Sequence, residues 1–270
     1  MTGCSDYSTL PKLLTIAGSD SAGCAGIQAD LKTFAALRCH GMSVLTSVTA
    51  QNTLGVTATY DVSVDVIERQ IDAVLSDVGA DAIKTGMLST RAIVEAVAAK
   101  LHQLGAGKLV VDPVLAASSG DILLQTDAID SLRRHLFPLA RLVTPNLREA
   151  EVLSELEIRS VADMEAAARA IHSFGSTAVL VKGGHLEGAA VDVYFDGRAI
   201  QRISGERIQT ANAHGAGCTL ASAIAAFLGH GHDLEEACHK GKAYVTAALQ
   251  ASFRIGGGRG PLGHFYEFWK

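Results

Sequence analysis

Short apolar segments alternate with longer amphipathic segments along almost the whole chain, and this alternation limits the folds open to it. The short segments have the length and composition of buried strands, at Leu13–Ala17, Val44–Ala50, Ala82–Thr85, Leu109–Asp112, Leu142–Thr144 and Val179–Lys182. Helical spacing fills the intervals, at Ala25–Cys39, Val66–Val78, Arg91–Leu104, Ala128–Leu136, Leu147–Glu155 and Met164–Phe174. Such alternation predicts an α/β fold with a mostly parallel central sheet and helices on both faces.

Local signals refine this plan. Val193–Phe195 and Arg198–Ile200 flank an Asp-Gly pair, which predicts a β-hairpin with a tight two-residue turn. Asp65 and Glu68 have the spacing of a capping box at the start of the second helix. Two further helices are expected after the hairpin, at Gly217–Leu228 and Leu234–Ser252.

Composition indicates one large globular domain. The chain has 270 residues, of which 48% are hydrophobic and 19% are charged, so it can bury a sizeable core. No linker, internal repeat or low-complexity segment divides it. We therefore expect a loose N-terminal extension at residues 1–12 and a single domain at residues 13–270.

The net charge and the cysteine content limit which partners the protein binds and which cellular compartment it occupies. The net charge is −5 without a basic cluster, which argues against a nucleic-acid partner. No apolar run has the length of about 18 residues that a membrane span requires, and residues 1–12 lack the apolar core of a signal peptide. The five cysteines are an odd number without a C-x-x-C pair. They favour reduced thiols in the cytoplasm over a disulfide framework or a zinc site.

A turn of small residues at Asn212–Leu220 predicts a phosphate site. Gly215, Ala216 and Gly217 lead directly into an apolar helix. The helix would therefore present free backbone N–H groups and the positive end of its dipole to an anion. Cys218 follows in the first helical turn, where a thiol ordinarily loses its proton more easily. The turn suggests an enzyme that handles phosphate groups.

The residues alone leave three interpretations of Cys218. It is a buried packing thiol, a nucleophile with His214 as its base, or a weak base or polar guide for a substrate hydroxyl. The nucleophile has the least support, because no orienting acid and no hydrolase signature such as G-x-S-x-G accompany it.

Polar residues follow several predicted strands, at the edge of the sheet where α/β proteins bind ligands. Asp112, Asn146 and Glu149 carry oxygen atoms that suit Mg²⁺, directly or through water. Glu149 equally suits the N-terminus of a helix, where a negative charge complements the dipole. Lys182 suits a phosphate contact, and its alternative is a solvated cation.

The turn Gly18–Gly26 joins the first strand to the first helix and matches neither a dinucleotide motif nor a P-loop. In the helix that follows, Asp30 falls beside the apolar stripe and needs a hydrogen-bond partner. A ligand donor such as an aminopyrimidine is one candidate, and an internal cap or salt bridge is the other. The side-chain amide of Gln51 can read a heteroaromatic base edge, or it simply begins a loop.

Seven motifs in order resemble one family, the hydroxymethylpyrimidine/phosphomethylpyrimidine kinases of thiamin biosynthesis, within the ribokinase-like superfamily. Each motif is weak by itself, but together they span the chain from Leu14 to about His264. They are Ile16–Asp30, Ala50–Thr53, Gly86–Leu88, Val111–Val114, Thr144–Ala150, Lys182–His185 and His214–Leu220.

The resemblance implies a three-layer α/β/α sandwich, usually a homodimer, which uses MgATP. It implies phosphorylation of 4-amino-5-hydroxymethyl-2-methylpyrimidine and then of its monophosphate. The residues expected around the pyrimidine are Gly18, Asp30, Gln51 and Met87. The anion hole for the transferring phosphoryl group would consist of Gly215, Ala216, Gly217 and Cys218. The resemblance assigns phosphate and Mg²⁺ to Lys182, Asp112, Asn146 and Glu149, with Asp112 and Glu149 nearest the metal and Thr210 and Lys242 as weaker nucleotide candidates.

The chain departs from the family pattern at three places. Ala216 stands where the family usually has Thr, Cys24 replaces a common Gly, and Ser118 stands where Lys is frequent. Wider relatives carry Asp at the position of Cys218. Since phosphoryl transfer passes through a loose transition state, positioning and charge neutralisation outweigh a strong base there. A vitamin B6 kinase that acts on pyridoxal or pyridoxine is the alternative, with a thiol hydrolase and a non-catalytic ligand-binding protein as candidates from other classes.

Overall fold

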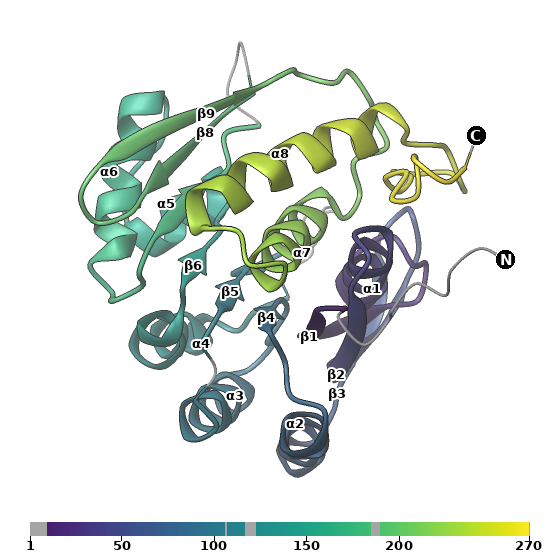
Figure 1. The fold of residues 1–270 in the computed structure, drawn as a ribbon, viewed down its shortest axis with the longest axis vertical. Coiled ribbons are helices and arrows are strands. Elements are labelled where there is room, and N and C mark those ends of the chain that lie inside the picture. Colours follow the sequence, from purple (N-terminus) through teal and green to yellow (C-terminus); the bar gives the residue numbers. More distant parts are fainter. Residues whose placement is uncertain (1–9, 106, 117–122, 185–189, 270) are drawn as a thin grey trace, which may run out of the picture.

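The computed structural model describes residues 10–105, 107–116, 123–184 and 190–269. Within these residues nine strands form a single sheet in the order β3-β2-β1-β4-β5-β6-β7-β8-β9 (Figure 1). The strands are β1 (Lys12–Asp20), β2 (His40–Gln51), β3 (Val56–Asp61), β4 (Ala82–Thr85), β5 (Leu109–Val111), β6 (Leu142–Val143), β7 (Val179–Val181), β8 (Ala190–Phe195) and β9 (Ile200–Gly205).

The sheet is parallel in its centre and antiparallel at both edges. The strands from β2 through β1, β4, β5 and β6 to β7 pair in parallel, whereas β3, β8 and β9 pair antiparallel to their neighbours. The mostly parallel sheet predicted from the alternation is confirmed. The carboxyl ends of the parallel strands consequently meet at one edge of the sheet.

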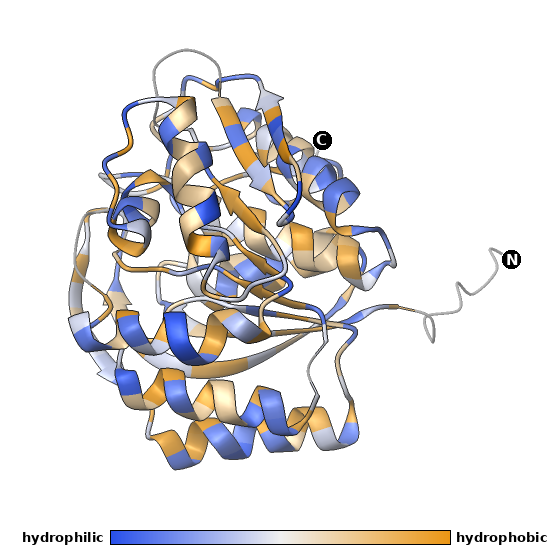
Figure 2. Ribbon diagram, turned by 90° about the vertical axis from the view of Figure 1, so that its left-hand side faces the viewer, coloured by the Kyte–Doolittle hydropathy of each residue, from blue (hydrophilic) through white to orange (hydrophobic). Residues whose placement is uncertain are grey.

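Helices cover both faces and bury two separate apolar layers. On one face lie α1 (Gly26–Ala36), α7 (Ala216–Gly229) and α8 (Leu234–Gln250), with Phe34, Ile224 and Val245 in the core. The other face carries α2 (Val64–Asp77), α3 (Arg91–Gln103), α4 (Thr126–Ser131), α5 (Leu147–Ser154) and α6 (Val161–His172). The expected three-layer α/β/α sandwich is therefore confirmed (Figure 1). Figure 2 shows polar and apolar residues on opposite sides of the outer helices.

Several local predictions need correction. The tight hairpin turn is wrong, because four residues, 196–199, separate β8 from β9. Asp196 Oδ1 accepts hydrogen bonds from the N–H groups of Arg198 and Ala199, at 2.8 and 2.7 Å, and Gly197 has a φ of +87°. An aspartate that caps its own turn in this way stabilises a wider loop than the two-residue form.

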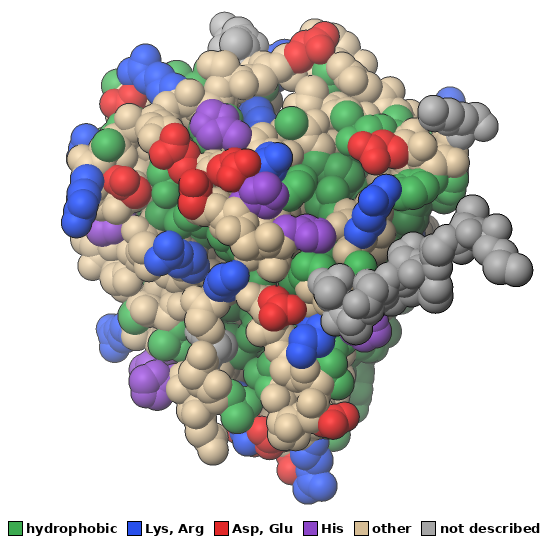
Figure 3. Space-filling model, in the orientation of Figure 1, with side chains coloured by type: hydrophobic (Ala, Val, Ile, Leu, Met, Phe, Trp, Pro, Cys, Tyr) green, Lys and Arg blue, Asp and Glu red, His purple; other side chains and the backbone are tan. Residues whose placement is uncertain are grey.

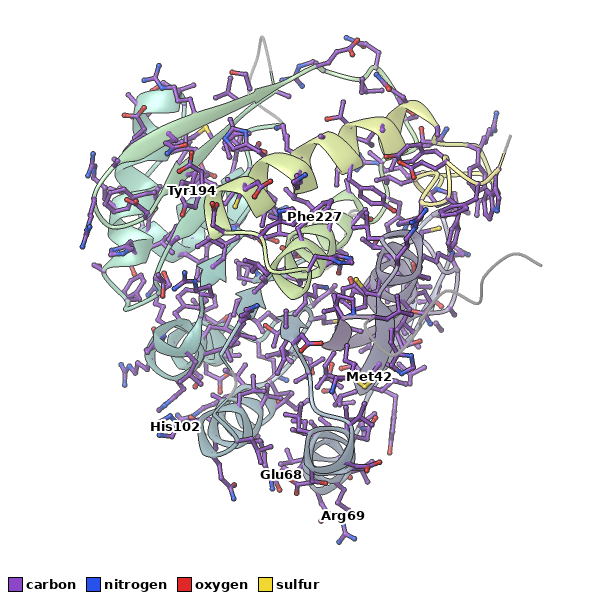
Figure 4. The ribbon with its side chains drawn as sticks, in the orientation of Figure 1. Met42, Glu68, Arg69, His102, Tyr194 and Phe227 are labelled. Carbon is purple, nitrogen blue, oxygen red and sulfur yellow. The ribbon has the colours of Figure 1, made fainter. Side chains whose placement is uncertain are left out.

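The capping box expected at Asp65 is also wrong. Helix α2 begins after Ser63, whose side chain makes no capping bond, and Asp65 instead pairs with Arg69 at 2.9 Å. Arg69 projects from the outer side of α2 (Figure 4). The structure has a capping box at Asn146 and Glu149, where both reciprocal bonds are present.

Two segments differ from their predicted extent. β3 was absent from the predicted strands because its side chains are largely exposed, so it lacks the apolar signal of a buried strand. The helix predicted at Ala128–Leu136 begins at Thr126 and widens into a π-helical turn at Leu132–Leu136. A 3₁₀ turn then carries Pro138, which cannot continue an α-helix.

Neither the surface charges nor the N-terminal residues indicate a particular class of binding partner. On the face shown in Figure 3, acidic and basic side chains are interspersed. None of the helices in the described part of the chain is both long and apolar enough to cross a membrane. β1 begins at Lys12, the last residue of the expected extension, and residues 1–9 lie outside the described residues, as do Ser118 and His185.

Candidate active site

The N-terminus of α7 forms a tight turn against the loop that follows β1. Gly215 caps the helix with a φ of +86°, and a Cβ placed there would overlap the carbonyl oxygen of Cys24. Only glycine tolerates both constraints. The Ala216 N–H donates to the Ala213 carbonyl at 3.2 Å, so this N–H is already engaged within the turn. The N–H groups of Gly217 and Cys218 are the next donors of the first turn that can face an anion.

Residues at the ends of β5, β6 and β7 converge on this turn. Lys182 Nζ lies 2.7 Å from Asp112 Oδ1 and 4.0 Å from Glu149 Oε2. A Cβ placed on Gly217 would be 3.2 Å from Lys182 Nζ and 3.8 Å from Asp112 Oδ2. The structure therefore brings the predicted cation, the predicted metal ligands and the predicted anion turn together. Their chemical roles stay predictions.

Glu149 serves both the helix and the site. Its Oε2 accepts from the Asn146 N–H at 2.7 Å, while Asn146 Oδ1 accepts from the Glu149 N–H at 2.9 Å. Burial raises the pKa of Glu149 to about 7, with the Lys182 cation opposing and the Asp112 carboxylate adding to the rise. Two buried carboxylates thus share one ammonium group, which is the kind of oxygen-rich, negatively charged set that suits Mg²⁺. Asn146 acts here as the helix cap.

The thiol of Cys218 is half-buried, and its pKa runs opposite to the sequence-based expectation. Burial raises the pKa of Cys218 to about 11. Lys84 lowers it, the carboxylates of Asp30 and Asp112 raise it, and the Gly26 N–H lowers it. The helix N-terminus therefore does not make this thiol acidic, because desolvation dominates. A protonated thiol argues against the nucleophile and fits a polar guide for a substrate hydroxyl.

The Asp30 carboxylate lies inside the core and does not face a ligand. Lys84 Nζ donates to both carboxylate oxygens at 3.0 and 2.9 Å, and the hydroxyls of Thr15 and Ser222 each donate at 2.6 Å. The side chains of Asp30 and Lys84 are both 0% exposed. The prediction that Asp30 contacts the substrate is wrong, and the internal salt bridge is the alternative that the structure shows.

Gln51 and His214 are in contact, and both line a pocket of about 310 Å³. Gln51 Nε2 lies 3.1 Å from His214 Nε2, and the Thr49 hydroxyl donates to Gln51 Oε1 at 3.0 Å. Burial lowers the pKa of His214; nearby Asp20 raises it and Arg259 lowers it. A neutral imidazole beside an oriented amide can recognise the polar edge of a heteroaromatic ring.

Gly18 and Met87, two further residues predicted at the pyrimidine, are in contact with each other. A Cβ on Gly18 would lie 3.0 Å from Met87 Sδ, so the two residues are in contact. Met87 is 7% exposed and lines a second pocket, of about 470 Å³, together with Asp61, Ser89 and Gln125. Gln51 and Met87 thus line different pockets, and of the four predicted pyrimidine contacts Gly18 and Met87 are in contact with each other.

Thr210 and Lys242 both have partners within the protein. The Thr210 hydroxyl lies 2.9 Å from the Ser252 hydroxyl, and Lys242 Nζ lies 2.7 Å from Asp192 Oδ2. Asp192 in turn accepts from the Gly183 N–H at 2.9 Å, next to Lys182. Lys242 is therefore connected to the site through Asp192, and its nucleotide role stays a prediction.

Asp20 organises the loop after β1. Its Oδ1 accepts from the Ala22 N–H at 2.9 Å, and its Oδ2 accepts from the N–H groups of Cys24 and Ala25 at 2.9 and 2.8 Å. The potential ligand atoms of Asp20, Cys24 and His214 lie within 4.8 Å of one another. Because the Asp20 carboxylate already accepts three backbone hydrogen bonds, we interpret this cluster as a structural element that fixes the conformation of the loop, and not as a metal site.

Sequence reasoning missed Lys84, the partner of Asp30. The signal was present, because this lysine interrupts the otherwise apolar and β-branched strand 82–85. A cation in a strand covered on both faces requires a buried anion. Pairing this residue with the inward-facing Asp30 would have identified the salt bridge.

His264 supports the anion turn from behind. Its Nε2 lies 3.0 Å from the Thr219 hydroxyl, which itself donates to the Gly215 carbonyl at 2.8 Å. Burial lowers the pKa of His264 to about 4, the nearby Lys32 lowers it further, and the Leu262 backbone opposes the shift. The imidazole is 3% exposed.

The lowered pKa of His264 predicts a pH-dependent stability. Between the ordinary histidine pKa of 6.5 and about 4, the unfolded chain binds a proton that the folded protein excludes. The free energy of unfolding should therefore fall as the pH drops through this window, by up to about 3 kcal/mol. Denaturant unfolding of the wild type and His264→Gln, whose amide keeps a donor, measures it. A stability difference between the two that is constant from pH 7 to 4 would contradict the assignment.

Comparison with known proteins identifies the family. The sequence matches the family described as phosphomethylpyrimidine kinase over residues 20–263. It is 52% identical over 261 residues to the hydroxymethylpyrimidine/phosphomethylpyrimidine kinase of Rhizobium meliloti (strain 1021), covering 95% of this chain and 98% of that protein.

Solved structures agree with the sequence match. An ADP complex of Bacillus subtilis pyridoxal kinase has a TM-score of 0.88 at 39% identity, covering 94% of this chain and 97% of that chain. The phosphomethylpyrimidine kinase of Clostridium difficile 630 has a TM-score of 0.79 at 42% identity, covering 88% and 99%. These likenesses confirm the ribokinase-like fold. The chain belongs to the phosphomethylpyrimidine kinase family.

Proposed function

We propose that this protein transfers a phosphoryl group from ATP to the hydroxymethyl group of 4-amino-5-hydroxymethyl-2-methylpyrimidine, and then phosphorylates the monophosphate, for thiamin biosynthesis. The observation that carries the proposal is the placement of the Lys182–Asp112 pair against Gly217 in the first turn of α7. A cation, two carboxylates and backbone N–H groups around one point are the parts that phosphoryl transfer needs. The family membership supplies the substrate class.

The residues divide the work as follows. The N–H groups of Gly217 and Cys218, with Lys182, receive the charged oxygens of the transferring group. The neutral Cys218 thiol accepts a hydrogen bond from the substrate hydroxyl and so orients it for in-line attack, since a loose transition state needs little base. Gln51 holds the ring edge, with Thr49 and His214 fixing its amide.

Asp112 and Glu149 would hold Mg²⁺, which neutralises charge on the phosphate oxygens when bound. The fit rests on the donor set, because two buried carboxylates share one lysine and the pKa of Glu149 is raised by burial. A second cation would relieve this excess of negative charge. Thr210 and Lys242 are proposed on the nucleotide side.

The remaining proposals concern the domain organisation, the oligomeric state and the cellular location of the protein. The single sheet that passes through β1 to β9 supports one domain over residues 13–270, behind the extension of residues 1–12. The family resemblance supports a homodimer. The free cysteines in the described part of the chain support a cytoplasmic location.

A vitamin B6 kinase is the second candidate, favoured by the 0.88 TM-score to the pyridoxal kinase structure. One experiment separates the candidates. The protein is given ATP and Mg²⁺ with the pyrimidine alcohol, its monophosphate, pyridoxal or pyridoxine, and ADP and products are measured. We expect ADP formation with both pyrimidine compounds at a higher kcat/KM than with either vitamer. Absence of ADP with both pyrimidines would reject the main proposal, and product formation without ATP would point to a hydrolase.

Gln51→Ala should raise the KM for the pyrimidine alcohol by roughly tenfold, because one oriented amide contributes about one hydrogen bond to the ring edge. The KM for ATP should stay unchanged, since the proposed phosphate and nucleotide contacts belong to Lys182, Thr210 and Lys242, whereas Gln51 bonds Thr49 and His214. Steady-state kinetics with each substrate varied in turn measures both constants. Gln70→Ala is the matched control, because Gln70 bonds the Leu45 backbone outside the site. Equal changes in both KM values would indicate general damage.

A further inference from the structure

The buried Asp30–Lys84 ion pair lies beneath α7, the helix that carries Cys218. The carboxylate collects bonds from three other elements: Lys84 on β4, the Thr15 hydroxyl on β1 and the Ser222 hydroxyl on α7. Both charged side chains are fully buried. One aspartate on α1 thus ties two strands and the anion-binding helix to a single point.

Ser222 and Cys218 lie on the same side of α7. They are four residues apart, and residues with that spacing stand one above the other on a helix. The buried surface of α7 is otherwise apolar and rich in alanine, with Leu220, Ile224 and Leu228 as its large side chains. Apolar packing has no direction of its own, so a hydrogen bond adds a more specific constraint on the rotation of the helix. The bond of 2.6 Å from Ser222 to Asp30 fixes it directly.

The charges of the pair reach the same thiol. Burial, the largest influence, lowers the pKa of Lys84, but Asp30, Cys218 and Asp112 together raise it by more, so the cation is kept. The Lys84 cation lowers the pKa of Cys218, against the effect of desolvation, and the Asp30 carboxylate raises it. A Cβ on Gly86 would come within 2.8 Å of Lys84 Nζ, so the glycine after β4 leaves the room that the ammonium group occupies.

We propose that Asp30, Lys84 and Ser222 form a positioning unit that sets the rotation of α7 and so aims the Cys218 thiol and the first-turn N–H groups at the transferring phosphoryl group. None of the three touches a substrate, and they act through α7. The inference rests on the proposed function, because it explains how α7 is held in the orientation that the phosphoryl-transfer site requires.

Two substitutions at the same carboxylate test this unit. Ser222→Ala and Thr15→Val each remove one hydroxyl that donates to Asp30 at 2.6 Å, but only Ser222 belongs to α7. We expect Ser222→Ala to lower kcat roughly tenfold or more with KM values within about twofold, because small misplacements of reacting groups act on kcat. Thr15→Val should keep kcat within about twofold. Thermal unfolding of both variants shows whether each folds, and similar midpoints make them a matched pair.

A second measurement does not depend on kinase activity. Iodoacetamide labelling of Cys218, followed by peptide mass spectrometry, reports how the thiol is held. We expect labelling several-fold faster in Ser222→Ala than in the wild type, because a less fixed helix exposes the thiol more often, and unchanged labelling in Thr15→Val.

The outcomes separate the inference from the proposed function. Equal kcat and equal labelling in Ser222→Ala and the wild type would overturn the positioning unit, as would equal losses in the two variants. A wild type that phosphorylates neither pyrimidine would overturn the proposed function, while the labelling comparison would still decide whether Ser222 fixes α7.

Discussion

Replacing Lys182 with Met should lower kcat/KM for the pyrimidine alcohol by roughly 10³-fold, a loss of about 4 kcal/mol of transition-state stabilisation. The side chain supplies a cation to the first turn of α7, 3.2 Å from the position of a Cβ on Gly217. It also neutralises two carboxylates, 2.7 and 4.0 Å away. Its loss removes a charge that favours the transferring group and leaves two charges that repel it.

The variant needs two controls because it also unpairs a buried carboxylate. Lys182→Met combined with Asp112→Asn removes the unpaired charge, and thermal unfolding then reports whether the fold is retained. Lys100→Met removes a lysine that pairs with Asp72 outside the site, 2.6 Å away. Steady-state kinetics with varied pyrimidine and varied ATP measures kcat/KM for each variant. A loss below about tenfold in Lys182→Met would show that this lysine neutralises Asp112 without assisting the transfer.

The sequence predicted the framework well because the framework depends on periodicity. The buried parallel strands are continuous apolar runs, and the helices between them repeat every three to four residues. β4 was predicted at Ala82–Thr85, the residues it occupies. β3 escaped prediction because it lies at an edge with exposed side chains, so no apolar run marks it.

The site was predicted in part, for a physical reason that individual residues show. The strand ends that carry Asp112 and Lys182 meet because parallel strands end at one edge, and this follows from the topology alone. The fate of Asp30 does not follow from topology. Its partners Lys84 and Ser222 are 54 and 192 residues away, so only the packed core reveals that the carboxylate is already satisfied.

The pKa of Cys218 escaped prediction for a related reason. From sequence, the helix N-terminus is visible and argues for an acidic thiol. Desolvation and the two nearby carboxylates depend on the tertiary structure, and together they outweigh the dipole and the Lys84 cation. The same residue therefore changes from a candidate nucleophile to a neutral guide once its surroundings are known.

Cys218→Ala should lower kcat by roughly 10²-fold while leaving the KM for ATP unchanged, because the thiol is proposed to orient the substrate hydroxyl. Cys218→Ser should retain much more of the activity, since a hydroxyl keeps one donor and one acceptor at the same place. If the thiol were a general base with a low pKa, Cys218→Ser would be as impaired as Cys218→Ala, because serine does not ionise at neutral pH. The comparison of the two variants thus separates a guide from a base.

Cys238→Ala is the matched control, because Cys238 is a fully buried cysteine on α8 away from the turn. It should change stability without changing kcat, as the loss of a small buried side chain does. Rapid-quench measurement of the first turnover, at saturating ATP and pyrimidine alcohol, detects the chemical step directly. If Cys218→Ala turned over at the wild-type rate, the thiol would be packing only, and the N–H groups of Gly217 and Cys218 with Lys182 would have to account for catalysis by charge neutralisation alone.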